Sequence, residues 1–181
     1  MRFNFLSVLA LVSLIMTSAE TNAADRDPEN ILYMDLEHGR VVIELRPDIA
    51  PQHVARIKEL AREGFYDGLT FHRVIDGFMA QGGDPSGNGT GGSGQNIPAE
   101  FSEANVAQHM RGTASMARSQ SPDSADSQFF ICFQPAPFLD GQYTIWGQVV
   151  EGMEYVDMIK RGEPVNDPDH IISMTVAADV D

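Results

Sequence analysis

The sequence predicts a mainly β fold, in which eight strands form a sheet that closes into a barrel and two α-helices cap it. About eight runs of β-branched and apolar residues follow one another, and only two segments show helical periodicity. Two of the runs, FFICF and YTIWGQVV, are apolar on both faces, which is typical of strands covered on each side. Closing the sheet would remove its exposed edges, and the two helices could cover its ends.

Turn residues separate the expected strands. His38-Gly39 joins the first two runs into a hairpin, and Asp76-Gly77 turns the chain between the third and the fourth. The 181 residues suffice for one domain with a core and not obviously for two, and no internal repeat is visible. The strands are expected at residues 31–37, 41–46, 69–75, 78–83, 111–117, 127–133, 143–150 and 170–178.

Two segments predict helices, at residues 50–64 and 152–162. In the first, Pro51 suits the first helical position and Gly64 ends the helix. Apolar residues recur on one face of each segment, as expected of a helix that packs against a sheet. These residues are Val54, Ile57, Leu60 and Ala61 in the first helix, and Met153, Val156 and Ile159 in the second.

Nearly half of the sixteen glycines fall in residues 82–94, which predicts a long loop. Gly87-x-Gly89-x-x-Gly92 matches the dinucleotide-binding string, but no helix follows it to face a pyrophosphate. The start of a calcium loop is also suggested at residues 84–88, but Gln95 stands where the closing Glu is required. The five histidines show no ligand spacing, so we expect no bound metal. We also expect no cofactor, since the dinucleotide string lacks its helix.

The formal net charge of −14 argues against nucleic acid and against an anionic membrane surface as partners. The first residues, with Arg2, an apolar run and a small polar end, predict a signal peptide at 1–23 and a mature chain at 24–181. No cysteine lies near the cleavage site, so we expect no lipid anchor. The lone Cys132 stands in an apolar run and is expected to be a buried small side chain.

Several segments together resemble the cyclophilins, the family of peptidyl-prolyl cis-trans isomerases. They are FHRVIDGFMAQGGD, GNGTGG, AEF, RGTASMA, SQFFICF and FLDGQYTIWGQVV, which occur in the family's order and span roughly residues 30–178. The resemblance implies a closed antiparallel eight-stranded barrel with a packed interior, two capping helices and a groove on the outside. It further implies a monomeric isomerase that acts on proline-containing, unfolded or partly folded polypeptides.

The resemblance also assigns the site. Arg73 stands at the position of the family's catalytic arginine, with His72 beside it. The expected substrate-binding residues are the apolar Phe78, Met79, Ala117, Phe130 and Leu139, the polar Gln81 and Gln128, and also Phe138 and Tyr143. From periodicity alone, Phe78 and Phe130 would be core residues, and Arg73 would be an ordinary surface arginine.

Three positions depart from the pattern of the best-known eukaryotic members. Phe138 replaces a tryptophan, Tyr143 a histidine and Arg118 an asparagine, which resembles the bacterial secreted branch and suggests a periplasmic protein. Because Phe138 has no indole N–H, we expect weak cyclosporin binding. One alternative stays open: a proline-peptide binding module or holdase in which isomerisation is incidental. An intact Arg73 favours the enzyme.

Overall fold

The computed structural model describes residues 26–180. The predicted signal peptide at 1–23 lies outside them, so this boundary stays a prediction. The strands are β1 (Ile31–Leu36), β2 (Gly39–Leu45), β3 (Arg73–Ile75), β4 (Met79–Gly82), β5 (Thr113–Met116), β6 (Phe129–Cys132), β7 (Ile145–Glu151) and β8 (Ile171–Val176). The helices are α1 (Pro51–Arg62) and α2 (Met153–Asp157), and short 3₁₀ turns lie at Pro28–Asn30 (η2), Pro137–Leu139 (η3) and Ala177–Asp179 (η4).

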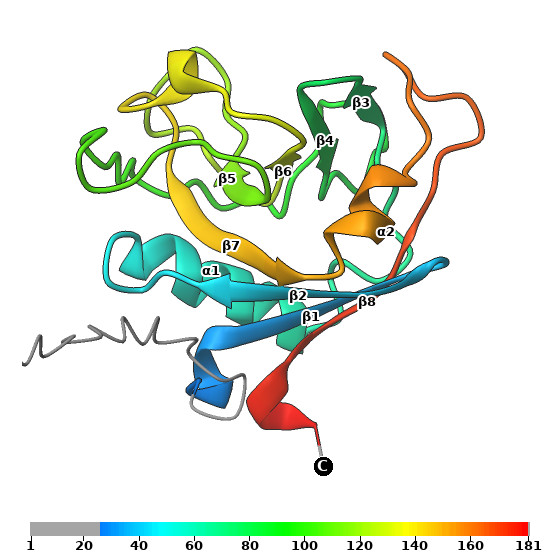
Figure 1. Ribbon diagram of the computed structural model, residues 1–181, viewed down its shortest axis with the longest axis horizontal. Helices are drawn as coiled ribbons and strands as arrows, with labels where there is room; N and C mark the ends of the chain where they lie inside the picture. Colours follow the sequence, from blue (N-terminus) through cyan, green and yellow to red (C-terminus); the bar gives the residue numbers. More distant parts are fainter. Residues whose placement is uncertain (1–25, 181) are drawn as a thin grey trace, which may run out of the picture.

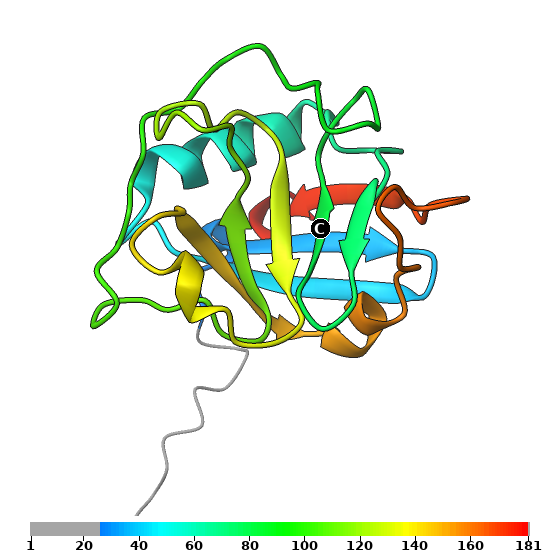
Figure 2. The same ribbon diagram turned by 90° about the horizontal axis from the view of Figure 1, so that it is seen from above.

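All eight strands belong to one antiparallel sheet in the order β3-β4-β6-β5-β7-β2-β1-β8. Figure 1 shows this sheet curling around the core, and Figure 2 shows α1 and α2 on opposite sides of it. The mainly β class, the eight strands and the two helices are therefore confirmed. β1 and β2 form the expected hairpin, but its turn residues are Glu37 and His38 rather than the predicted His38-Gly39. Gly39 already pairs with Leu36 as the first residue of β2.

The prediction of a closed barrel is wrong, because the sheet remains open between β3 and β8. The backbone bonds across this opening, from Phe71 N–H to the Asp169 carbonyl and from Gly68 N–H to the Ile171 carbonyl, come from residues before β3. Inside β3, Val74 instead exchanges two 2.8 Å hydrogen bonds with Gly162. The segment before β8 thus pairs with the outer edge of β3, where β8 itself has no ladder.

The second helix is shorter than predicted. It ends at Asp157, although Ile159 is buried as its apolar pattern indicates. Beyond the helix the backbone finds partners outside it: Lys160 N–H donates to the Asp169 carboxylate at 2.7 Å, and Gly162 pairs with β3. These tertiary bonds replace the hydrogen bonds of further helical turns.

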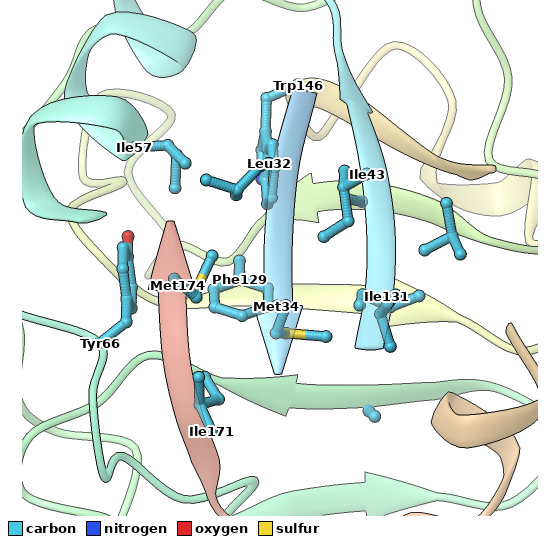
Figure 3. Close-up of a cluster of buried hydrophobic side chains, with 14 of the residues drawn as sticks. Leu32, Met34, Ile43, Ile57, Tyr66, Phe129, Ile131, Trp146, Ile171 and Met174 are labelled. Atoms are coloured by element: carbon cyan, nitrogen blue, oxygen red, sulfur yellow. The ribbon is translucent and has the colours of Figure 1, made fainter. Parts of the chain in front are cut away.

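The main core fills the inside of the curled sheet. Trp146, Phe129 and Tyr66 meet edge to face, with ring centroids 5.8 and 5.7 Å apart, and α1 adds Ile57 to the same cluster (Figure 3). The predicted stripe of α1 is buried, which confirms that face of the helix. Within residues 26–180 the longest helix has twelve residues, too few to cross a membrane, and no helix there is both long and apolar enough to do so.

Candidate functional site

A second, smaller apolar cluster lies on the other face of the sheet. Along β6, Phe129 and Ile131 belong to the main core, whereas Phe130 and Cys132 belong to the second cluster. On β4, Ala80 faces the core and Met79 the second cluster. Successive side chains of a strand point to opposite faces, so this alternation divides one apolar run between two environments. Periodicity alone could not show which face is which.

The second cluster forms the floor of a pocket of about 930 Å³. Met79, Phe130 and Leu139 are nearly buried, whereas Phe138 at the rim is 64% exposed. The ring of Phe138 lies 5.4 Å from that of Phe78, and the ring of Tyr143 meets Phe130 edge to face at 5.9 Å. Ten of the eleven predicted site residues line this pocket: His72, Arg73, Phe78, Met79, Gln81, Ala117, Phe130, Phe138, Leu139 and Tyr143.

Arg73 enters the pocket from the edge strand β3. Its neighbour Val74 is buried in the main core, so Arg73 is directed to the pocket face. Arg73 lies opposite Gln81 in the β3–β4 register, and its Nη1 donates to Gln81 Oε1 at 3.3 Å. Gln81 Nε2 donates to Gln128 at 3.0 Å, and Gln128 donates to the carbonyl of Gly91. Gln128, the eleventh predicted residue, does not line the pocket, but through Gln81 it connects Arg73 to the glycine-rich loop.

Glu163 also lines the pocket, although no pattern in the sequence indicates it. Its Oε1 lies 2.5 Å from Arg73 Nε. The segment that carries it is fixed at both ends: Gly162 pairs with Val74, and Val165 N–H donates to the His72 carbonyl at 3.1 Å. Residue 163 is therefore held beside residue 73. No local motif marks a glutamate 90 positions away in the chain, so only the fold reveals this pair.

His72 is a neutral, buried side chain of the pocket wall. Burial lowers the pKa of its imidazole below the usual value, and the adjacent Arg73 acts in the same direction. The nearby Asp84 carboxylate acts to raise that pKa, but its effect is smaller. Neither ring nitrogen has a hydrogen-bond partner among the described residues. At neutral pH the pocket therefore holds no second cation directly beside Arg73.

The glycine-rich loop forms another wall and is organised by Asp84. This carboxylate accepts hydrogen bonds from the backbone N–H groups of Ser86, Asn88 and Gly89 at 2.8, 3.0 and 2.6 Å. Burial acts to raise the pKa of Asp84, but these bonds hold it below its usual value. A Cβ on Gly91 would lie 2.2 Å from Asp84 Oδ1, so this position requires glycine. The carboxylate that suggested a calcium loop is thus engaged by the loop backbone.

A Ser-His-Asp line also lies close to the pocket floor. His109 Nε2 is 3.0 Å from Ser115 Oγ, and His109 Nδ1 is 2.8 Å from Asp140 Oδ1. However, Ser115 and His109 are fully buried, and the Ser115 hydroxyl donates to the Thr144 carbonyl. The imidazole stacks behind Phe130, with ring centroids 6.1 Å apart. A hydroxyl without access to a substrate does not act as a nucleophile. Ser115, His109 and Asp140 therefore form a buried hydrogen-bonded group that packs behind Phe130 in the pocket floor.

Cys132 is completely buried in the same cluster. Burial, together with the negative charge of Asp140, raises the pKa of its thiol to about 12. A protonated, inaccessible thiol does not act as a nucleophile. The expectation of a buried small side chain is confirmed.

Comparisons with known proteins agree with this fold. The sequence profile of the family "Cyclophilin type peptidyl-prolyl cis-trans isomerase/CLD" matches residues 31–176. A "Probable peptidyl-prolyl cis-trans isomerase" of Brucella suis is 51% identical over 191 residues, which covers 96% of this chain and 95% of the relative. "Peptidyl-prolyl cis-trans isomerase B" of Bacillus subtilis is 48% identical over 132 residues and covers 72% of this chain and 91% of the relative.

Two solved structures have the same fold. The crystal structure of cyclophilin AquaCyp293 from Hirschia baltica gives a TM-score of 0.78 at 31% identity and covers 86% of this chain and 76% of that one. A cyclophilin-type peptidyl-prolyl cis-trans isomerase from Cryptosporidium parvum, crystallised in the presence of the dipeptide Ala-Pro, gives a TM-score of 0.74 at 28% identity. That match covers 81% of this chain and 98% of the other.

Proposed function

Because this chain belongs to the cyclophilin-type peptidyl-prolyl cis-trans isomerases and is itself such an enzyme, we propose that Arg73 is its catalytic residue and exported polypeptides are its substrates. The observation that carries the proposal is the position of a guanidinium at the edge of an apolar pocket. The described pocket offers a place for a proline ring and one fixed cation beside it.

The reaction requires no bond to be broken. Rotation about an X–Pro amide is opposed by resonance, with a barrier of about 18–20 kcal/mol, and takes tens to hundreds of seconds without a catalyst. In the twisted transition state the proline nitrogen becomes pyramidal and regains a lone pair. A donor aimed at this nitrogen binds the transition state more strongly than the planar amide, which is the condition for catalysis.

Arg73 suits this task because a guanidinium stays charged and presents donors in a fixed plane. Glu163 engages its Nε and Gln81 engages its Nη1, which leaves Nη2 to donate to a bound amide. A turnover of about 10³ per second would require a barrier reduction of about 7 kcal/mol. This reduction would be shared between the hydrogen bond to the nitrogen and the fixing of the ring.

The apolar socket would hold the proline ring while the other side of the bond turns. Met79, Phe130 and Leu139 would contact the ring, and the flexible thioether of Met79 can adapt to it. Burying the ring in this socket would bind both isomers. It would not by itself favour the twisted state, so the socket acts on affinity and Arg73 on rate.

Two further parts of the proposal concern where the enzyme works. Residues 1–23 have the pattern of a secretory signal, so we place the mature chain in the periplasm, where it would assist the folding of exported proteins. We further propose that it acts as a monomer.

The mechanism is tested by Arg73→Ala and Arg73→Lys in the mature chain, residues 24–181. We expect the alanine variant to turn over a short X–Pro peptide about 10²- to 10³-fold more slowly, the scale for losing one preorganised donor. The lysine variant should also be poor, because an ammonium lacks the planar fork. Peptide affinity should change far less. A folded Arg73→Ala variant that isomerises at nearly the wild-type rate would contradict the assignment and favour a binding module.

A further inference from the structure

Arg118 is fixed at the rim of the pocket by backbone carbonyls. Its Nε and Nη2 donate to the Gln142 carbonyl at 3.1 and 2.9 Å, and its Nη1 donates to the carbonyls of Ser119 and Gln120 at 2.8 and 3.3 Å. A guanidinium has five N–H donors. These four bonds therefore leave one Nη2 N–H free, on a cation whose orientation is already set.

The charge of Arg118 has no carboxylate partner. Within residues 26–180, all of the other lysine and arginine side chains lie within 4.0 Å of an Asp or Glu oxygen, whereas Arg118 does not. In a chain with a formal net charge of −14, carboxylates are abundant. An arginine that remains without one in this part of the chain is therefore an exception that calls for a physical explanation.

This uncompensated charge faces the pocket. Arg118 lines it together with Tyr143, and its guanidinium lies 4.6 Å above the Tyr143 ring and 5.7 Å from that of Phe101. The other charged lining residues, Arg73 and Glu163, form an ion pair whose formal charges cancel. The lining as a whole thus carries one net positive charge, on the surface of an otherwise strongly acidic protein.

We propose that Arg118 is a subsite for a carboxylate, so that the enzyme favours X–Pro bonds with an Asp or Glu within two residues of the proline. The inference rests on the proposed isomerase site and adds its substrate class. The free N–H would donate one charge-assisted hydrogen bond to the carboxylate. Because the guanidinium is already held by four bonds, little side-chain entropy is lost when the peptide binds.

The test uses short peptides with a single X–Pro bond that differ in one residue. Glu and Gln are compared at each of the two positions before and the two positions after the proline. For each position the ratio of kcat/KM for the Glu peptide to that for the Gln peptide is measured. The ratio is determined for the wild-type mature chain, for Arg118→Gln and for Arg118→Lys. Both values in the ratio come from the same protein preparation, so a variant that is only partly folded lowers both kcat/KM values equally and leaves the ratio unchanged.

Arg40→Gln provides a matched control. Arg40 also lies over a tyrosine ring, 4.5 Å from that of Tyr33, but on the β1–β2 hairpin and outside the pocket lining. The variant removes the same charge and the same kind of cation–π contact, so it separates the effect of net charge from the effect of the subsite.

At low ionic strength we expect wild type to favour Glu at one position by about two- to fivefold, the effect of a solvent-exposed ion pair. Arg118→Gln should abolish the preference, whereas Arg118→Lys should retain part of it and Arg40→Gln all of it. Added salt should weaken it, because about 0.1 M salt screens charges beyond roughly 10 Å. A ratio near one at all four positions, or an equal ratio in wild type and Arg118→Gln, would overturn the inference. Loss of activity on the Gln peptides would instead question the proposed isomerase site.

Discussion

The Glu163 carboxylate and the Arg73 guanidinium form an ion pair at the pocket edge, with Oε1 2.5 Å from Nε. The pair is partly open to solvent, since the Arg73 side chain is 40% and the Glu163 side chain 57% exposed. An exposed pair contributes little to stability, about 0–1 kcal/mol. The ion pair instead orients the guanidinium, because Glu163 and Gln81 accept hydrogen bonds from two of the three nitrogens of Arg73.

Glu163→Ala should lower kcat by up to about fivefold with little change in KM, because the guanidinium is less well held but the socket is intact. Glu163→Gln keeps an acceptor for Nε and should recover part of the loss. Single-turnover and steady-state rates on one X–Pro peptide measure both parameters. Glu154→Ala, an exposed glutamate on α2 outside the pocket, is the matched control. An unchanged or increased kcat in Glu163→Ala would show that the pair does not position Arg73.

Phe130→Ala should damage binding more than turnover. The ring is nearly buried between Met79, Leu139 and Tyr143, so its loss opens the floor of the socket. Removal of a buried phenylalanine also costs about 3–5 kcal/mol of folding stability, so thermal unfolding must first show that the variant is folded. Peptide titration followed by NMR gives the affinity. Unchanged affinity in a folded variant would remove Phe130 from the proline socket.

Cyclosporin should inhibit weakly, and Phe138→Trp should strengthen the inhibition. Phe138 is exposed at the rim, where a larger indole has room and can offer an N–H donor. One added hydrogen bond is worth about 0.5–1.5 kcal/mol, which corresponds to roughly 2- to 13-fold in inhibition. The measurement is the cyclosporin inhibition constant of wild type and of Phe138→Trp, with the same peptide as substrate. Equally tight inhibition of wild type and Phe138→Trp would show that residue 138 does not determine the affinity for cyclosporin.

Export should remove the first 23 residues. N-terminal sequencing of the protein isolated from its native host is expected to begin at or near Ala24, with Ala19 as the second possible cleavage point. Fractionation of the cells should place the shortened chain in the periplasm. Recovery of the full-length chain from the cytoplasm would refute both the signal peptide and the localisation.

Stability should decrease as the pH falls below about 6.5, the ordinary pKa of histidine. Burial lowers the pKa of His53, His72 and His109 in the folded chain. The carboxylates of Glu100, beside His53, and Asp140, beside His109, raise the pKa of their partners only in part. Below pH 6.5 the unfolded chain therefore binds more protons than the folded one. The contribution of these neutral histidines to the free energy of unfolding is fully present above pH 6.5. It is lost as the pH falls from 6.5 toward the lower pKa values of the folded chain.

Urea unfolding at pH 7.5, 6.5 and 5.5 tests this dependence. His53→Gln cannot take up a proton and keeps an amide near Glu100, so its stability should vary less with pH than that of wild type. The comparison of slopes removes any constant cost of the substitution. A wild-type free energy of unfolding that is unchanged from pH 7.5 to 5.5 would rule out this origin.

Much of the fold could be predicted from the sequence, because the tertiary contacts bury the same faces that the local apolar patterns indicate. The apolar stripe of α1, the β1–β2 hairpin and the buried run of β6 are all present, although the hairpin turn lies one residue earlier than predicted. The closed barrel and the longer second helix were wrong for one shared reason. Gly162 pairs with Val74 of β3, far earlier in the chain, and Lys160 N–H donates to the Asp169 carboxylate nine positions later. Neither contact follows from a periodic pattern of the sequence.

The strand and helix types follow from periodicity, because they depend on residues that are close together in the chain. The family resemblance, carried by contiguous motifs, named the ten predicted residues that line the pocket. Only the tertiary structure decided which face of β4 and β6 forms the pocket, since alternation defines two faces without naming them. It also decided that Glu163 meets Arg73 and that Arg118 has no carboxylate partner within residues 26–180. Charges pair through space, and their partners lie wherever the fold brings separate segments together.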